Sequence, residues 1–178
     1  MSGLGHLLAD SLSRVTDQAV SSDARTVRVG LLGCGNVGGA LVPLLRAQRD
    51  AIAARTGLNL VVTSVAVRNM SRDRGVELGD VSLTNDAMAV VSDPEIDVVV
   101  EVIGGIEPAR ELIVAALSAG KPVVTGNKEL LANHGAELFE LADSNGVDLL
   151  FEAAVAGGIP LIRPLRESLR GEPVSRVM

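Results

Sequence analysis

The sequence predicts an α/β fold built on a doubly wound parallel sheet. From Val27 onwards, short apolar runs rich in β-branched residues alternate with longer amphipathic stretches, which is the pattern of repeated strand–helix units. Most of the short runs are apolar at consecutive positions, as expected of strands that are covered on both faces. A glycine-rich turn joins the first run to the first amphipathic stretch. With 47% hydrophobic residues in 178, the chain has enough apolar material for one domain.

Each element is expected from its local pattern. Five strands are predicted, over residues 27–32, 60–67, 97–103, 122–125 and 147–151. The first helix is predicted over residues 36–55, with a kink at Pro43, because proline lacks a backbone donor. The second begins at Pro108, stops at Gly120 and should bury Leu112, Ala115, Ala116 and Ala119. A third covers residues 128–144, and residues 80–91 should hold one short strand and one short helix.

Composition excludes several classes of function. The net charge of −6 and an isoelectric point near 4.9 argue against a nucleic-acid partner, which would require a basic face. No apolar run approaches the roughly 20 residues that span a bilayer, and the first residues lack the pattern of a signal peptide. The single cysteine, Cys34, permits no internal disulfide and is interpreted as a small loop residue rather than a reactive thiol. A soluble, cytoplasmic protein without a membrane partner is therefore expected.

The glycine-rich turn has the pattern G-x-G-x-x-G. It follows an apolar strand and opens a helix, which is the setting in which this pattern binds a dinucleotide in a Rossmann-type domain. Gly33 should make the tight turn, Gly35 should let the backbone approach the pyrophosphate, and Gly38 should let the helix pack closely on the strand. The phosphates would lie on unpaired N–H groups at the start of the helix. A structural turn without a ligand is the alternative.

The end of the second strand bears on the choice of cofactor. A carboxylate there accepts hydrogen bonds from the adenosine ribose of NAD, whereas an arginine suits the additional phosphate of NADP. The strand ends Ala66-Val67-Arg68-Asn69, without a carboxylate, and Arg72 and Arg74 follow. The sequence therefore predicts a preference for NADP(H), with NAD(H) as the other candidate and a solvated arginine as the alternative.

Lys128 lies where the strand 122–125 gives way to the next helix. A cation there opposes the helix dipole, so its position calls for an explanation other than helix stability. The carboxyl ends of the strands face the ligand crevice in such sheets, and Lys128 would point to where nicotinamide and substrate meet. An ordinary exposed lysine is the alternative. His134, on the helix that follows, is interpreted as a packed or half-exposed residue rather than an acid or base.

Four segments together resemble homoserine dehydrogenases: VRVGLLGCGNVGGALVPLL, VVVEVIGG, PVVTGNKELLA and LLFEAAVAGGIPLI. The resemblance covers nearly everything from Val27 onwards. It implies reversible, NAD(P)-dependent interconversion of L-homoserine and L-aspartate 4-semialdehyde, a step toward threonine, methionine and isoleucine. It also implies that the small-molecule substrate and the oligomer contacts of a complete enzyme involve a catalytic region beyond Met178, and that these 178 residues alone do not oxidise homoserine.

The resemblance also implies roles for individual residues. Cofactor contacts are implied at the glycine turn, at the adenosine end and near the nicotinamide: Gly35, Asn36, Val37, Ala66, Arg68, Ile103 and Gly104. Lys128 resembles the family lysine at the crevice between cofactor and substrate. Glu152 and the carbonyls of Val155, Gly157 and Ile159 resemble a monovalent-cation site, normally for sodium, and carboxylate with backbone oxygens suits a hard cation. Ala156 stands where the family often has glycine, so this chain has less backbone freedom at that position of the loop.

The expected organisation has three parts: an N-terminal extension over residues 1–26, a Rossmann domain over 27–151, and the start of a substrate and dimerisation region over 152–178. Two rival interpretations stay open. One is a different Rossmann oxidoreductase, which the segment of the predicted cation site, residues 152–159, argues against. The other is a non-catalytic dinucleotide-binding module or sensor. Measuring turnover beside cofactor binding separates an enzyme from a module.

Overall fold

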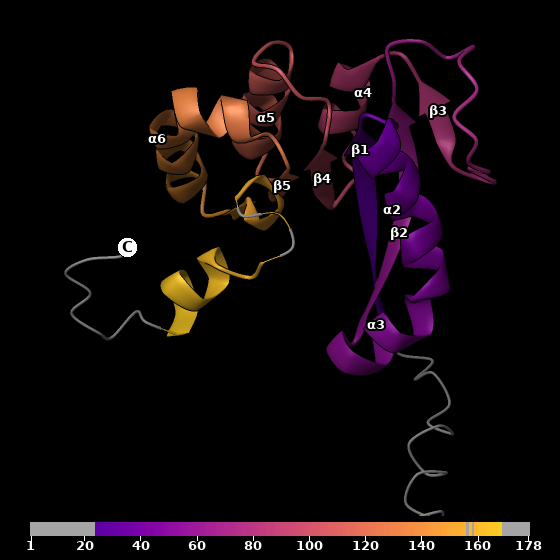
Figure 1. Ribbon diagram of the computed structural model, residues 1–178, viewed down its shortest axis with the longest axis horizontal. Helices are drawn as coiled ribbons and strands as arrows, with labels where there is room; N and C mark the ends of the chain where they lie inside the picture. The colour runs from indigo at the N-terminus through magenta and orange to yellow at the C-terminus, as the bar shows by residue number, and fades with distance from the viewer. Residues whose placement is uncertain (1–23, 156, 158, 169–178) are drawn as a thin grey trace, which may run out of the picture.

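The computed structural model describes residues 24–155, 157 and 159–168 and shows a six-stranded parallel sheet (Figure 1). The strand order is β3-β2-β1-β4-β5-β6, which is the order of a doubly wound α/β sheet. The strands are β1 (Arg25–Leu32), β2 (Leu58–Ala66), β3 (Ser82–Thr84), β4 (Val98–Glu101), β5 (Val123–Thr125) and β6 (Leu149–Leu150). The predicted fold class is confirmed.

Helices cover both faces of the sheet (Figure 1). They are α2 (Asn36–Ala47), α3 (Arg49–Thr56), α4 (Ala87–Ser92), α5 (Ala109–Ser118) and α6 (Lys128–Ser144). Alternate residues of β1 enter two separate apolar clusters: Val29 and Leu31 pack with Val42 of α2, whereas Leu32 packs with residues of α4, α5 and α6. Side chains alternate between the two faces of a strand, so β1 contributes to both cores. This explains why its second half is apolar at consecutive positions.

Gly30 of β1 lies at a close contact that the sequence pattern did not reveal. A Cβ atom at this position would lie 2.8 Å from Cγ1 of Val90 and 3.0 Å from Cγ2 of Ile96. Both side chains belong to the segment around α4, which crosses β1 and β2. Glycine therefore permits α4 to pack directly on the backbone of the central strand.

The predicted single helix over residues 36–55 is wrong, because the structure has two helices that meet at Gln48. The N–H of Gln48 donates to the carbonyl of Leu44 at 2.9 Å, and its own carbonyl accepts from the N–H of Ile52 at 2.8 Å. Gln48 thus ends α2 and begins α3. Pro43 lies inside α2, which continues for four residues beyond it, to Ala47. Near this end, the Arg46 guanidinium donates to the carbonyl of Glu77 at 2.9 Å.

Other details differ from the expectation: β2 begins at Leu58 and ends at Ala66, and β6 is shorter than predicted, with only Leu149–Leu150. β1 begins at Arg25, since Arg25 and Thr26 already pair with the start of β2; residues 1–23 of the predicted extension lie outside the described residues. Ala119 is exposed, not buried, because it follows the last residue of α5. β4 ends at Glu101 instead of residue 103, because the Glu101 side chain turns to the next backbone N–H groups. By contrast, α6 runs from Lys128 to Ser144 as predicted.

The segment 80–91 holds a short strand, β3, and a short helix, α4, as predicted. Asp86 begins α4 by accepting a hydrogen bond from the N–H of Ala89 at 2.9 Å. Within the described part of the chain, no helix combines the length and the apolar character that crossing a membrane requires.

Candidate functional site

A crevice opens where the strand order reverses, between the carboxyl ends of β1 and β4. β1 leads into the glycine turn, and β4 leads into the loop 102–105. In open α/β sheets this switch point is where ligands bind. A hollow of about 540 Å³ lies here. Five residues predicted to contact a cofactor line it together: Gly33, Gly35, Ala66, Arg68 and Ile103.

The three glycines of the turn meet different surroundings. Gly33 has a φ of 100°, and a Cβ atom there would lie 3.0 Å from the carbonyl oxygen of Val102. At Gly38 a Cβ atom would lie 2.1 Å from the carbonyl oxygen of Gly33, so no other residue fits without moving the backbone. At Gly35, by contrast, no atom lies within 4 Å of the Cβ position. Packing therefore requires glycine at positions 33 and 38, whereas Gly35 leaves open space.

The remaining residues of the predicted cofactor set are placed differently. Asn36 lines a neighbouring hollow of about 330 Å³, together with Gly35 and Arg72. The linings of the two hollows do not include Val37, Gly104 or Lys128. Val37 is 65% exposed at the start of α2. The structure thus gathers the glycine turn and the end of β2 in one place, whereas Lys128 lines neither hollow.

Arginines gather at the rim near the end of β2. Arg68, Arg72 and Arg74 all line the main hollow, and all three lie on or next to one exposed loop. Two nitrogens of Arg74 donate to backbone carbonyls of that loop, those of Arg72 at 2.6 Å and of Asn69. Arg74 therefore holds the shape of the loop. Arg68 and Arg72 make no ion pair within the described residues.

Lys128 is the first residue of α6, and its side chain is exposed. Asn127, just before it, is buried and caps the helix: its Oδ1 accepts from the N–H of Leu130 at 3.1 Å. The Nδ2 of Asn127 donates to the carbonyl of Gly105 at 2.6 Å. The start of α6, and with it Lys128, is therefore tied to the loop that follows β4.

Sequence reasoning missed three buried polar residues of this region: Glu101, Thr125 and Asn127. Glu101 has no exposed surface and accepts hydrogen bonds from the N–H groups of Ile103 at 2.7 Å and Gly104 at 3.2 Å. These N–H groups are therefore engaged, and a cofactor would meet the carbonyls of Ile103 and Gly104 or the side chain of Ile103. The available signal was a carboxylate at the end of the apolar run Val98–Glu101, where a charge is costly unless hydrogen bonds satisfy it.

Glu152, the side chain of the predicted cation site, lies in the short helix η1 (Glu152–Ala154). Its Oε2 accepts from the backbone N–H of Arg163 at 3.2 Å, just before the short helix η2 (Pro164–Ser168). Of the predicted carbonyl ligands, Val155, Gly157 and Ile159 belong to the described residues, and residues 156 and 158 between them lie outside these. Among the residues that the structure describes, no three His, Cys, Asp or Glu side chains form a metal-binding group.

The cysteine lies in an apolar cluster, and the second histidine takes part in a polar contact at the surface. Cys34 is 8% exposed and belongs to the apolar cluster beneath α2. His134 is half-buried on α6, with its Nδ1 3.5 Å from Oε2 of Glu137. The same carboxylate accepts from Nε of Arg110 at 3.1 Å, and this hydrogen bond holds the pKa of Glu137 below its ordinary value. His134 thus belongs to a surface link between α5 and α6.

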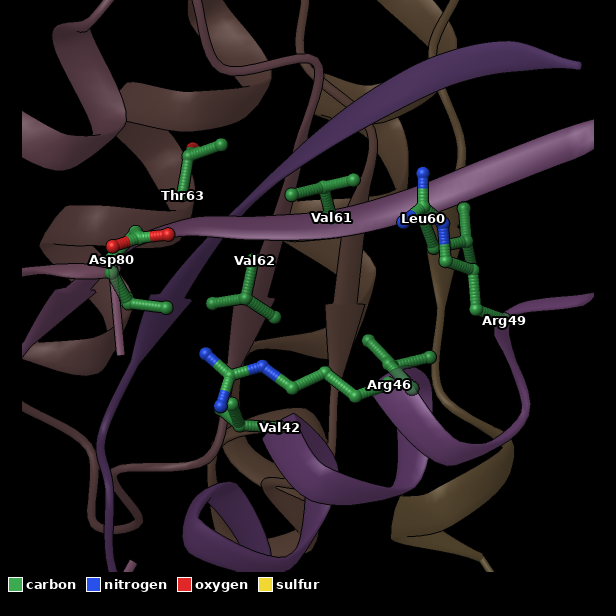
Figure 2. A pocket seen from close by; sticks show the side chains of 10 residues that line it. Val42, Arg46, Arg49, Leu60, Val61, Val62, Thr63 and Asp80 are labelled. Atoms are coloured by element: carbon green, nitrogen blue, oxygen red, sulfur yellow. The ribbon is translucent and has the colours of Figure 1, made fainter. Parts of the chain in front are cut away.

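A separate hollow of about 420 Å³ lies along the first half of β2, next to α2 and α3 (Figure 2). Val62 and Arg46 lie on one side of β2, and Val61 and Thr63 stand on the other (Figure 2). Thr63 is skipped where β1 and β2 shift register, and its buried Oγ1 has no hydrogen-bond partner within the described residues. None of the predicted site residues lines this hollow.

The strand order and the glycine turn at the crevice define a Rossmann-type dinucleotide-binding domain. Residues 33–152, more than half of the chain, match the protein family described as "Homoserine dehydrogenase, NAD binding domain". The chain belongs to the homoserine dehydrogenase family and carries its NAD-binding domain.

Individual relatives agree with this assignment. The homoserine dehydrogenase of Mycobacterium tuberculosis (strain H37Rv) is 48% identical over 155 residues, which make up 87% of this chain and 35% of that protein. The Bacillus subtilis homoserine dehydrogenase is 41% identical over 154 residues, 86% of this chain and 36% of that protein. The chain therefore spans about a third of the length of these relatives.

Solved structures give the same family. The crystal structure of a homoserine dehydrogenase from Thiobacillus denitrificans matches with a TM-score of 0.78 and 49% identity, over 83% of this chain and 34% of that chain. A hyperthermophilic archaeal homoserine dehydrogenase in complex with NADPH matches with a TM-score of 0.68 and 29% identity, over 82% of this chain and 50% of that chain.

Proposed function

We propose that this chain binds NADP(H) in preference to NAD(H) and is the cofactor-binding portion of an enzyme that interconverts L-homoserine and L-aspartate 4-semialdehyde. The family and the crevice support the dinucleotide. The observation that carries the preference is the position of Arg68 and Arg72, two cations without an ion-pair partner within the described residues, at the adenosine end of the hollow. The similar archaeal enzyme that was solved with NADPH agrees with it.

Different residues of the crevice would bind different parts of the cofactor. The pyrophosphate would lie over Gly35 and Asn36, where α2 begins without a side-chain cap from the described residues and offers its first N–H groups. A guanidinium of Arg68 presents planar, paired donors to a 2′-phosphate. The nicotinamide would lie against Ile103 and Gly104, and when bound it supplies the hydride chemistry.

Lys128 would act at the far end of the crevice, where the cofactor meets the substrate. Its exposed ammonium, placed by the cap at Asn127, offers three donors and a positive charge to the carboxylate or the side-chain oxygen of a zwitterionic substrate. Such a group orients the substrate relative to the nicotinamide, and orientation is a large part of the catalysis of hydride transfer.

A sodium ion would be held by the carboxylate of Glu152 and by the carbonyls of Val155, Gly157 and Ile159. The donor set is all oxygen, as a hard cation requires, and Glu152 is half-buried just before these carbonyls in the chain.

We also propose that the chain divides between residues 151 and 152, into a Rossmann domain and a region for substrate binding and dimerisation. The complete protein would then be a cytoplasmic homo-oligomer whose substrate is a small molecule.

Calorimetric titration of the 178-residue chain with NADPH and with NADH tests the preference. We expect NADPH to bind at least about tenfold more tightly, since a charge-assisted contact to a phosphate contributes about 1.5 to 3 kcal/mol. Equal affinities for the two cofactors would contradict the proposal. In the complete protein, cofactor binding without any oxidation of homoserine would favour a non-catalytic binding module instead.

Cys34 offers a second measurement of the same site. It lines both hollows beside the glycine turn, and a dinucleotide in the crevice would cover its small exposed fraction. Saturating NADPH is therefore expected to slow the modification of Cys34 by a thiol reagent at least about fivefold. Nicotinamide mononucleotide at the same concentration is the control, because it lacks the adenosine part. A labelling rate that NADPH leaves unchanged would place the cofactor elsewhere.

A further inference from the structure

Glu101 is a fully buried carboxylate at the end of the central strand β4. Each of its oxygens has a donor: Oε1 accepts from the N–H groups of Ile103 and Gly104, and Oε2 accepts from the hydroxyl of Thr125 at 2.6 Å. Burying a charge costs free energy of desolvation, and three hydrogen-bond donors offset part of that cost. An ionised carboxylate is only an acceptor, so it matches three donors without conflict.

The hydrogen bonds continue from Glu101 into the segment that carries Lys128. The hydroxyl oxygen of Thr125 accepts from the N–H of Asn127 at 3.0 Å, and Asn127 donates through Nδ2 to the carbonyl of Gly105. The carbonyl of Glu101 also accepts from the N–H of Gly126 at 3.1 Å. The network is therefore closed: it leaves β4 at Glu101, passes through β5, and returns to the loop 102–105 at Gly105.

We propose that Glu101 is the positioning residue that holds one wall of the crevice, at its nicotinamide end, and the segment that carries Lys128 in one arrangement. The wall is the loop 102–105, of which Val102 and Ile103 line the hollow, and the segment from Thr125 to Lys128 is hydrogen-bonded to that loop at Gly105. This inference rests on the proposed function for the identity of the ligand, whereas the network itself is independent of it. Glu101 does not touch the cofactor; it acts through the backbone that does.

The network also determines which groups the loop can offer. Because the N–H groups of Ile103 and Gly104 donate to Glu101, the loop presents carbonyl oxygens to a ligand. The nicotinamide carboxamide carries an N–H₂ donor that matches such oxygens. An adenosine fragment without nicotinamide makes no use of this wall, since the adenosine end lies at Arg68.

Two pairs of variants test the positioning role. Glu101→Gln keeps the size of the side chain and replaces one acceptor oxygen by an N–H₂ donor. Either this donor faces Thr125, whose hydroxyl must then reverse, or it faces the loop, and the N–H groups of Ile103 and Gly104 both lose their acceptor. Thr125→Val removes the hydroxyl at constant shape, whereas Thr125→Ser keeps it. Val99→Ala is the matched control, because Val99 is fully buried two residues earlier on the same strand and has no polar role.

The expected result is a selective loss of the nicotinamide part of binding. Glu101→Gln and Thr125→Val should weaken NADPH about tenfold and leave 2′-phospho-ADP-ribose within about twofold. Thr125→Ser should bind NADPH as tightly as the unmodified chain does. Val99→Ala should leave the ratio of the affinities for NADPH and 2′-phospho-ADP-ribose unchanged. Equal weakening of both ligands would overturn the proposal, since it would mean a purely structural role. Unchanged NADPH binding in a folded Glu101→Gln would overturn it as well.

Amide hydrogen exchange separates this inference from the proposed function. If the unmodified chain bound neither NADPH nor the fragment, the proposed function would fail, but exchange would still report on the network. The amides of Ile103, Gly104 and Asn127 should exchange at least about tenfold faster in Glu101→Gln than in Val99→Ala. Equal exchange rates in the two variants would overturn the positioning role whatever the ligand is.

Discussion

Gly38→Ala is expected to destabilise the domain by about 3 kcal/mol and to abolish cofactor binding. The added Cβ would lie 2.1 Å from the carbonyl oxygen of Gly33 and 3.2 Å from Cγ2 of Val102, so the backbone of α2 must move away from the turn. For a domain of this size, the loss corresponds to a fall of roughly 6 to 12 °C in the melting temperature. Thermal unfolding with circular dichroism and calorimetric titration with NADPH measure the two effects.

Two neighbouring glycines provide matched controls. Gly39 is in the same helix, and a Cβ there would meet only Cγ2 of Val76 at 3.5 Å, an ordinary contact. Gly39→Ala should therefore leave the melting temperature unchanged or raise it, because alanine is favoured in helices by about 1 kcal/mol over glycine. Gly35→Ala should preserve the fold and weaken only the cofactor. A Gly38→Ala protein as stable as Gly39→Ala would show that the turn has another geometry.

Arg68→Asp is expected to weaken NADPH about a hundredfold while changing NADH only a few-fold, so that the preference is lost or inverted. The substitution removes a charge-assisted contact, of about 1.5 to 3 kcal/mol, and adds a repulsion against the 2′-phosphate. The new carboxylate would also lie where an NAD-type ribose offers hydroxyl donors. Titration of each cofactor at two salt concentrations measures the change, since screening should reduce the NADPH effect.

Arg55→Asp is the control for net charge. Arg55 is exposed in the last turn of α3, which leads into the start of β2 and is therefore remote from the crevice at the ends of the strands. Its reversal makes the same change in total charge, and it should alter neither affinity by more than about twofold. An equal loss of NADPH binding in both variants would assign the preference to overall charge and not to Arg68.

The order of strands and helices was predictable because a local sequence pattern indicates each element. The run from Val27 to Leu32, the turn at Gly33 and the helix from Lys128 to Ser144 all appear in the structure where the pattern placed them. Strand and helix periodicities act over a few residues, and glycine at positive φ is a local requirement. The break at Gln48 was not predictable, because no glycine or proline stands there to mark the end of α2.

The sequence by itself determined the fold class, the glycine turn and the candidate residues Arg68 and Lys128, since each depends on near neighbours in the chain. Only the tertiary structure decided which of them share a hollow, that Arg74 is engaged by its own loop, and that Gly30 faces α4. It alone also revealed the bond between Glu101 and Thr125, which are 24 residues apart in the chain. Such contacts depend on the register of β4 against β5, and register is set by packing across the whole sheet.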